Sequence, residues 1–356
     1  FGSSIDFHPQ QLLVFAAPAP FFTSVGVRSP SMSAQKMNLI EALTVLSRDH
    51  SNVEAFWAVT GFCKDQWWIP VVFCAGYLSM VYATRNTIGK HPYGKIVDYC
   101  FAAWNFGLSI FSTWGCYYLA RGLFTTTFED GLQYTICGPT TELVHKSSGR
   151  PMILALCLFC LSKIPELGDT VFLILKNKKV RFLQWYHHAT VMLFCWLALA
   201  TEYTPGLWFA GTNYFVHSVM YMYFFLMTFP TTAKLVKPIA PMVTVIQIVQ
   251  MVWGLIVNGI AIGTYFTTGN CQIQSITVYA AIAMYASYFY LFSKLFFEAH
   301  GSAKGGKRSL AREVSRKLSE ALLEHPGDDQ DSAKASAGGK ENRGKKPTSG
   351  KHMKVN

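Results

Sequence analysis

The sequence has few charged side chains. Only 14% of its 356 residues are Asp, Glu, Lys or Arg, roughly ten percentage points fewer than in a soluble globular protein. The stretch from residue 301 to 356 alone holds 13 of the 31 basic and 7 of the 20 acidic residues. This scarcity argues against a soluble multidomain enzyme. It also argues against a nucleic-acid-binding protein, because the excess positive charge is not gathered on a folded surface among aromatic side chains.

Long apolar runs take the place of the missing charge. About 20 predominantly apolar residues in a helix cross the roughly 30 Å hydrocarbon core of a membrane. Seven runs are long enough: 66–84, 97–120, 151–175, 183–202, 206–229, 238–262 and 274–297. Several ends carry aromatic residues, as helix ends at a membrane interface do: Trp67, Trp68, Trp185, Tyr203 and Trp208. We therefore expect an all-α integral membrane protein with seven transmembrane helices.

The connections between these runs alternate between basic and non-basic. Because Lys and Arg concentrate in cytoplasmic loops, the alternation places the N-terminus in the lumen or outside and the C-terminus in the cytoplasm. The most compact basic cluster lies in the third connection and consists of Lys176, Lys178, Lys179 and Arg181. We expect three parts: a lumenal segment over 1–65, a seven-helix membrane domain over 66–300, and a basic, disordered cytoplasmic tail over 301–356.

The third run contains charged residues, which are costly inside a membrane. Each costs about 2.5–3.5 kcal/mol at mid-membrane on insertion scales, so such residues usually face a protein interior. The polar residues of this run are Lys163, Glu166, Asp169 and Thr170. A spacing of three places the charged ones along one helix face, and Pro165 allows a local bend. Two interpretations stay open: a functional site, or an internal salt bridge from Lys163 to Glu166 that only joins two helices.

The fourth run opens with Gln184-Trp185-Tyr186-His187-His188. Adjacent residues of a helix point about 100° apart, whereas Gln184 and His188 share a face. Histidines in such a place serve as metal ligands, nucleophiles or acid–base groups. Taken alone, they also fit a pair of interfacial histidines at the membrane edge.

The fifth and sixth runs each carry a polar stripe. Asn213, His217 and Tyr221 recur every four residues in the fifth run and share one helix face. Gln247 and Gln250 lie three residues apart in the sixth. Such amides often only join helices through hydrogen bonds of around 0.6 kcal/mol each, so a structural role is the better single explanation for the two glutamines.

The depth of these residues in the membrane indicates one shared site. Counted from the cytoplasmic basic residues at 1.5 Å per residue, most of the polar side chains lie about 9–20 Å deep, with His217 nearer the middle. One buried pocket that opens toward the cytoplasm accounts for all of them. Its substrate would be an amphiphile with its head in the pocket and its tail among the helices.

The runs hold too few histidines for a di-iron centre. Only His187, His188 and His217 lie within a run, whereas a histidine-box desaturase or hydroxylase needs many more such ligands. We therefore expect no metal, and we favour nucleophilic and acid–base catalysis by imidazole on a thioester. The alternatives are that di-iron enzyme, a seven-helix receptor, whose pocket would open to the outside, and a transporter, for which internal repeats are lacking.

Four segments resemble, in order and spacing, the motifs of the ELO fatty acid elongases. They are 163–170, similar to KxxExxDT; 184–188, similar to HxxHH; 213–223, similar to NxxxHxxMYxYY; and 244–250, similar to TxxQxxQ. The resemblance covers about residues 66 to 300. It implies a fold in which six of the seven helices form a barrel around an acyl tunnel, in the membrane of the endoplasmic reticulum.

The resemblance also implies the reaction, in which a long-chain acyl-CoA and malonyl-CoA give a 3-ketoacyl-CoA, CO2 and CoA without a further cofactor. It implies that His187 accepts the acyl group, that His188 is its neighbour in the box, and that His217 helps to bind or decarboxylate malonyl-CoA. The supporting polar groups would be Lys163, Glu166, Asp169, Thr170, Gln184, Asn213, Tyr221, Gln247 and Gln250. Candidate partners are membrane lipid, the ketoacyl reductase, dehydratase and enoyl reductase of the elongation cycle, and a second copy in a homodimer.

Gln184 departs from the family motif, since many members have a histidine there. Glutamine donates and accepts hydrogen bonds but carries no proton at neutral pH, so activity survives if this position only orients its neighbours. The glutamine variant is associated with polyunsaturated substrates. The surrounding residues nevertheless look closest to the subgroup that extends saturated and monounsaturated long chains.

The basic cluster of the third connection has two interpretations. Its positive charge would hold the phosphates of CoA at the pocket mouth, or it only sets the topology.

The cysteine positions predict one disulfide. Cys63, Cys137 and Cys271 fall on the predicted lumenal side, where the compartment is oxidising. We expect Cys137 and Cys271 to pair and to tie the second connection to the sixth; two free thiols are the alternative. Cys157 and Cys160 lie one turn apart within a run, as packing residues rather than a redox pair.

Overall fold

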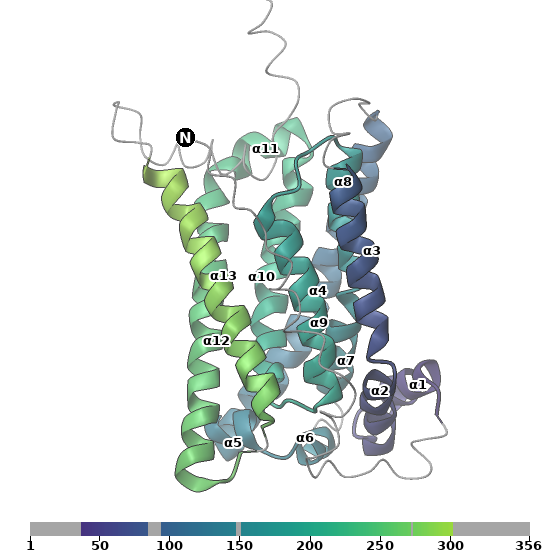
Figure 1. Ribbon diagram of the computed structural model, residues 1–356, viewed down its shortest axis with the longest axis vertical. Helices are drawn as coiled ribbons and strands as arrows, with labels where there is room; N and C mark the ends of the chain where they lie inside the picture. The colour runs from purple at the N-terminus through teal and green to yellow at the C-terminus, as the bar shows by residue number, and fades with distance from the viewer. Residues whose placement is uncertain (1–36, 85–93, 147–150, 272, 302–356) are drawn as a thin grey trace, which may run out of the picture.

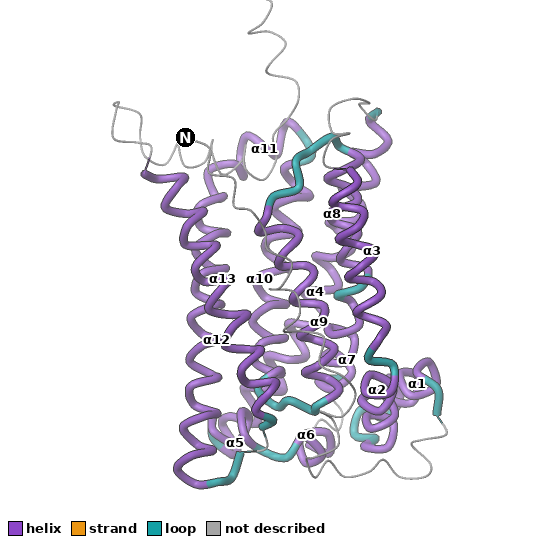
Figure 2. Tube along the Cα trace, viewed as in Figure 1, coloured by secondary structure: helices purple, strands orange, loops and turns teal. Residues whose placement is uncertain are grey.

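The chain folds into a bundle of long helices. A computed structural model describes residues 37–84, 94–146, 151–271 and 273–301, and every element in these ranges is a helix (Figures 1 and 2). The long helices are α3 (Trp68–Thr84), α4 (Lys95–Asp130), α9 (Phe182–Ala200), α10 (Gly206–Met227), α12 (Ala240–Thr268) and α13 (Ser275–Gly301). The shorter ones are α1 (Leu39–Arg48), α2 (Val53–Asp65), α5 (Leu132–Cys137), α6 (Thr140–Lys146), α7 (Met152–Ser162), α8 (Gly168–Leu175) and α11 (Pro230–Val236), with 3-10 turns at Pro165–Leu167 and Lys237–Ile239. Of the tail expected over 301–356, residue 301 ends α13 and residues 302–356 lie outside the described part, as do the first 36 residues.

Each of the seven apolar runs coincides with one long helix or, for 151–175, with the pair α7 and α8. By length and hydropathy, Pro230–Thr268 and Ser275–Phe297 are sufficient to cross a membrane, and the bent pair of α2 and α3, at 55°, would add a third span. Helices α9 and α10, of 19 and 22 residues, are long enough but are not among these spans. The described helices thus establish a membrane protein with two or three clear spans.

The third run is broken at Pro165. Helix α7 ends at Ser162, α8 begins at Gly168, and a 3-10 turn lies between them. Proline has no N–H to donate and its ring clashes with the preceding turn, so the bend expected from the sequence forms here. At this break the side chains of Lys163 and Glu166 lie inside the bundle, where the residues are only 2% and 3% exposed.

Glycines allow the long helices to pack closely. A Cβ atom at Gly115 of α4 would meet the ring of Tyr214 of α10, and one at Gly254 of α12 would meet the ring of Tyr285 of α13, at 2.3 and 2.2 Å respectively. Real side chains do not approach so closely, so only glycine lets these rings lie on the helix backbone. As a result, α4 packs along α10 and α12 packs along α13.

The two ends of the bundle differ. Helices α1, α2, α5 and α6 lie at one end, whereas α11 and the connection from α8 to α9 lie at the other (Figure 1). At the first end a disulfide joins Cys137, the last residue of α5, to Cys271, just after α12; this is the pair expected from the sequence. Tyr203 and Trp208, expected as interfacial anchors, are instead buried in the bundle at 4% and 9% exposure.

Candidate active site

Polar residues predicted from four separate runs meet in one cavity, which we call the polar cavity. It measures about 280 Å³, and α8, α9, α10 and α12 contribute most of its polar wall. The predicted residues that line it are Asp169, Gln184, His187, His188, Asn213, His217, Tyr221, Gln247 and Gln250. Side chains of α4 and α13 complete the wall.

Three basic residues of the connection from α8 to α9, namely Lys178, Lys179 and Arg181, also line the polar cavity. They place positive charge where the cavity reaches that end of the bundle. The fourth member of the predicted cluster, Lys176, is set apart from them. Its Nζ lies 2.7 Å from Oδ1 of Asp98 and 4.5 Å from the centre of the Phe101 ring.

His187 and His188 are held by different neighbours. Nε2 of Gln184 lies 2.9 Å from Nε2 of His188, as expected for two residues on one helix face. The ring of His187 packs at 4.9 Å from the ring of Tyr288 on α13, whose hydroxyl donates to the backbone oxygen of His187 at 3.3 Å. Gln184 thus orients His188, whereas a tyrosine outside the motifs positions His187.

The carboxylate of Asp169 accepts hydrogen bonds from two neutral donors on different helices. Nε1 of Trp104, on α4, donates to Oδ1 at 2.6 Å, and the hydroxyl of Tyr221, on α10, donates to Oδ2 at 2.8 Å. Oδ2 lies 3.8 Å from Nε2 of His188, which is too long for a direct hydrogen bond. Nothing in the sequence singles out Trp104, because a tryptophan inside an apolar run looks like a packing residue.

Lys163 and Glu166 form a buried ion pair beside the polar cavity rather than in its wall. Nζ of Lys163 lies 2.7 and 2.9 Å from the two carboxylate oxygens of Glu166, and Oγ of Ser162 donates to Oε1 at 2.8 Å. Oε2 of Glu166 lies 3.9 Å from Nδ1 of His217. The salt bridge that the sequence left as an alternative is therefore present, and it lies behind His217.

Thr170 does not line the polar cavity. It is fully buried, and its Oγ1 lies 2.9 Å from the hydroxyl of Tyr77 on α3. Because Thr170 directly follows Asp169, its side chain points about 100° away around the helix. It joins α8 to α3 through this contact.

The stripes of α10 and α12 both contribute to the wall of the polar cavity. Asn213 and His217 are buried at 7% exposure each, and Oδ1 of Asn213 has no hydrogen-bond partner among the described residues. Gln250 is also buried, at 5% exposure. Nε2 of Gln247 donates to a methionine sulfur of α10 at 3.3 Å, so this glutamine both lines the cavity and joins two helices.

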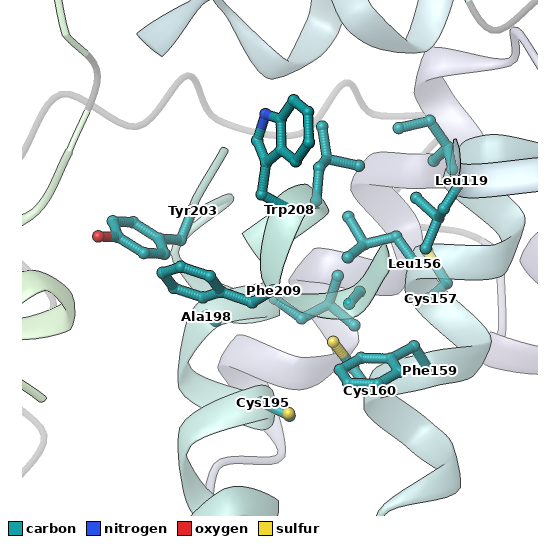
Figure 3. Packing of buried hydrophobic residues seen from close by; sticks show 14 of the residues in the cluster. Leu119, Leu156, Cys157, Phe159, Cys160, Cys195, Ala198, Tyr203, Trp208 and Phe209 are labelled. Carbon is teal, nitrogen blue, oxygen red and sulfur yellow. The ribbon is translucent and has the colours of Figure 1, made fainter. Parts of the chain in front are cut away.

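A second cavity, which we call the apolar tunnel, follows α9 away from the polar cavity. One face of α9 lines it, through His187, Val191, Phe194, Cys195, Ala198 and Leu199. From His187 to Leu199 the helix rises about 18 Å at 1.5 Å per residue. Figure 3 shows part of the wall, where Phe159 and Cys160 of α7 and Phe209 of α10 contribute. His187, Asn213 and Gln250 line both cavities, so the tunnel meets the polar cavity at these residues.

This arrangement suits an amphiphile with its reacting group at the head of an apolar chain. The polar cavity accommodates a charged head, and an imidazole lies where the two cavities meet. The apolar tunnel has a lining that suits an acyl chain, but at about 40 Å³ it must widen to admit one. Among the described residues, no group of three or more His, Cys, Asp and Glu side chains is arranged to hold a metal ion.

Comparison with known proteins identifies relatives of the chain. Residues 62–308 match the family described as ELO: GNS1/SUR4 family. "Very long chain fatty acid elongase 4" of Trypanosoma cruzi is 38% identical over 229 residues, which cover 64% of this chain and 78% of that protein. "Fatty acid elongase 3" of the same organism is 34% identical over 67% of this chain and 85% of its own length. "Very long chain fatty acid elongase 6" of Drosophila melanogaster is 34% identical over 69% of this chain and 76% of its own length.

Proposed function

Because the chain belongs to the ELO: GNS1/SUR4 family and is a fatty acid elongase, we propose that it condenses a long-chain acyl-CoA with malonyl-CoA in its two cavities. The products are a 3-ketoacyl-CoA, CO2 and CoA. One observation carries this proposal: His187 lies in the wall of both cavities. An acyl chain in the apolar tunnel brings its thioester carbonyl to this imidazole, while the CoA lies in the polar cavity.

In the first step, His187 takes the acyl group. A nitrogen of the neutral imidazole attacks the thioester carbonyl, the bond to sulfur breaks, and CoA leaves with the proton that the imidazole loses. The product is an acyl-imidazole. Tyr288 supports this step because its ring and hydroxyl contact His187 and limit the orientations of the imidazole.

In the second step, malonyl-CoA loses CO2 and the electron pair of the broken bond forms an enolate. The enolate carbon attacks the acyl carbonyl and the bond to the imidazole nitrogen breaks, which gives the 3-ketoacyl-CoA; the released imidazole of His187 takes up a proton from the solvent. His217 and Asn213 lie one turn apart on α10 in the wall of the polar cavity. Donors at such a place stabilise the negative charge on the enolate oxygen.

The basic residues of the polar cavity support binding of CoA from one side. The phosphates of CoA fit the positive charge of Lys178, Lys179 and Arg181, whereas Lys176 is engaged with Asp98. Both substrates are CoA esters, so the same three side chains serve each in turn.

The bundle is oriented with this basic end in the cytoplasm. Lys and Arg concentrate in cytoplasmic loops, and a disulfide at the opposite end suits an oxidising lumen. Helices α1 and α2 lie at the disulfide end and α13 ends at the other (Figure 1). These features support seven crossings of the endoplasmic reticulum membrane, with a lumenal N-terminus and a cytoplasmic C-terminus. Of the crossing helices, α7, α9, α10, α12 and α13 line the apolar tunnel. The 3-ketoacyl product then meets the reductases and dehydratase of the cycle in the same membrane.

Labelled malonyl-CoA tests the reaction. Membranes or detergent-purified protein, incubated with a long-chain acyl-CoA and malonyl-CoA labelled at C2, should form a labelled 3-ketoacyl-CoA with two more carbons and should release CO2. Because imidazole rather than a metal carries the reaction, an excess of chelator should change the rate by less than about 2-fold. Formation of a desaturated or hydroxylated acyl product, or loss of activity that added metal restores, would contradict the proposal.

Filling the apolar tunnel should shorten the longest acyl-CoA that the enzyme extends. Ala198→Trp places an indole in the wall far from His187, and Cys195→Trp places one nearer, so the second variant should show the lower limit. Leu197→Trp is the matched control, since Leu197 does not line the tunnel. A panel of acyl-CoA chain lengths measures the limit, and activity retained on short chains shows that each variant is folded. Equal profiles for all three variants would mean that the acyl chain lies elsewhere.

A further inference from the structure

We propose that Trp104 is a positioning residue of the condensation reaction, which acts by fixing the carboxylate of Asp169 beside the histidine box. The inference rests on the proposed function. Trp104 does not line either cavity, so it acts on the substrate only through Asp169. It lies on α4, outside the four motifs.

The indole N–H determines which carboxylate oxygen of Asp169 faces the polar cavity. Trp104 occupies Oδ1 at 2.6 Å, which leaves Oδ2 to Tyr221 at 2.8 Å and to the neighbourhood of His188 at 3.8 Å. A carboxylate free to rotate would exchange its two oxygens and lose this arrangement. Hydrogen bonds from one donor on α4 and one on α10 therefore fix the orientation of the Asp169 carboxylate on α8.

The indole ring is itself held in place. A Cβ atom at Gly168 would lie 3.2 Å from the Trp104 ring, closer than nearly all such contacts, so the ring rests on the backbone of α8 next to Asp169. One turn further along α8 the indole also contacts Phe172, with ring centres 5.8 Å apart. The contacts with Gly168 and Phe172 hold the ring against α8, and a Cβ atom in place of the glycine before Asp169 would press on it.

Held in this way, Asp169 connects two residues that line the polar cavity. Tyr221 keeps its hydroxyl on Oδ2, and Oδ2 presents negative charge to His188, whose Nε2 also contacts Gln184. At 3.8 Å the carboxylate makes no hydrogen bond to the ring, but its negative charge stabilises the positive charge that the imidazole gains during proton transfer. Loss of the Trp104 donor should thus slow the chemical step while substrate binding is retained.

Two variants of Trp104 that both remove the ring separate this role from simple packing. Trp104→Leu has no donor, whereas Trp104→Gln keeps an amide N–H able to reach the carboxylate. Trp104→Leu should lower kcat roughly 10- to 100-fold with KM for acyl-CoA within about 2-fold, and Trp104→Gln should recover at least about 5-fold of that loss. Trp114→Leu is the control, because Trp114 is on the same helix and packs on Phe111 and Tyr118; it should leave kcat within about 2-fold.

A double-mutant cycle with Asp169→Asn shows whether Trp104 acts through that carboxylate. If it does, Trp104→Leu should lower kcat by less than about 2-fold in the Asp169→Asn background, because the two residues form one unit. Equal kcat for the Leu and Gln variants, or additive losses in the cycle, would overturn the positioning role while the elongase function stands. A wild-type chain that forms no 3-ketoacyl-CoA would overturn the proposed function itself.

Discussion

Replacing His187 by alanine should abolish 3-ketoacyl-CoA formation, with a loss on the order of 10³-fold or more, because the variant lacks the nucleophile. The imidazole is the one predicted catalytic group that lines both the polar cavity and the apolar tunnel. Alanine leaves both cavities open, so binding of the two CoA esters should persist. The rate of labelled malonyl-CoA incorporation measures the loss.

Trapping the acyl-enzyme makes this test specific. With acyl-CoA alone, the wild type should release CoA and gain the mass of one acyl group on the peptide that carries His187, as read by mass spectrometry. His187→Ala should do neither. His145→Ala is the control, since His145 is exposed on α6 at the opposite end of the bundle, and it should leave the rate unchanged. Acylation mapped to His188 or His217 instead would reassign the nucleophile.

Breaking the buried ion pair should give the second large effect, a loss in the free energy of unfolding. Glu166→Gln leaves the ammonium of Lys163, at 2% side-chain exposure, without its counter-charge, and breaking a buried pair in this way costs about 3–5 kcal/mol. Replacing both partners by apolar residues, in Lys163→Met/Glu166→Leu, should recover most of that free energy because no uncompensated charge remains. Activity should stay low in the double variant, since Glu166 also lies beside His217.

Thermal or denaturant unfolding in detergent measures these changes. Asp130→Asn is the matched control: the ion pair of Asp130 with Lys146 has side chains 27% and 36% exposed, and a pair of this kind is worth less than about 1 kcal/mol. A Glu166→Gln variant no less stable than Asp130→Asn would show that Lys163 finds another partner or loses its proton.

The helical spacing of the polar residues predicts most of the side chains that line the polar cavity. The spacing of polar residues by three or four fixes which side chains share a helix face, and the cost of polar groups in lipid turns that face inward. Asn213 and His217 of α10 and Gln250 of α12 therefore lie in the wall of one cavity. Both rules depend only on neighbours in the chain, which is why sequence suffices for them.

The misplaced and missed residues depend on contacts between distant segments. Lys176 is set apart from the polar cavity because Asp98 of α4 offers it a partner, and Thr170, which helical geometry turns away from Asp169, finds its partner in Tyr77 of α3. Trp104 was missed for the same reason, since its role follows from a carboxylate 65 positions later. The local spacing of residues gives no signal for contacts between side chains so far apart in the sequence.

The observed ends of the helices also differ from the ends of the apolar runs. The second apolar run ends near residue 120, but α4 continues to Asp130, because backbone hydrogen bonding does not stop where charged residues appear. The short helices α5, α6 and α11 lie outside the apolar runs or at their margins, so hydropathy alone gives them no signal.

The disulfide between Cys137 and Cys271 closes a loop of sequence that contains every predicted catalytic histidine. A protease that cuts once in any connection within this loop, such as 176–181, divides the polypeptide into two pieces that each keep one of the paired cysteines. The nicked enzyme therefore migrates at its full mass on a non-reducing gel and separates into two bands only after a thiol is added.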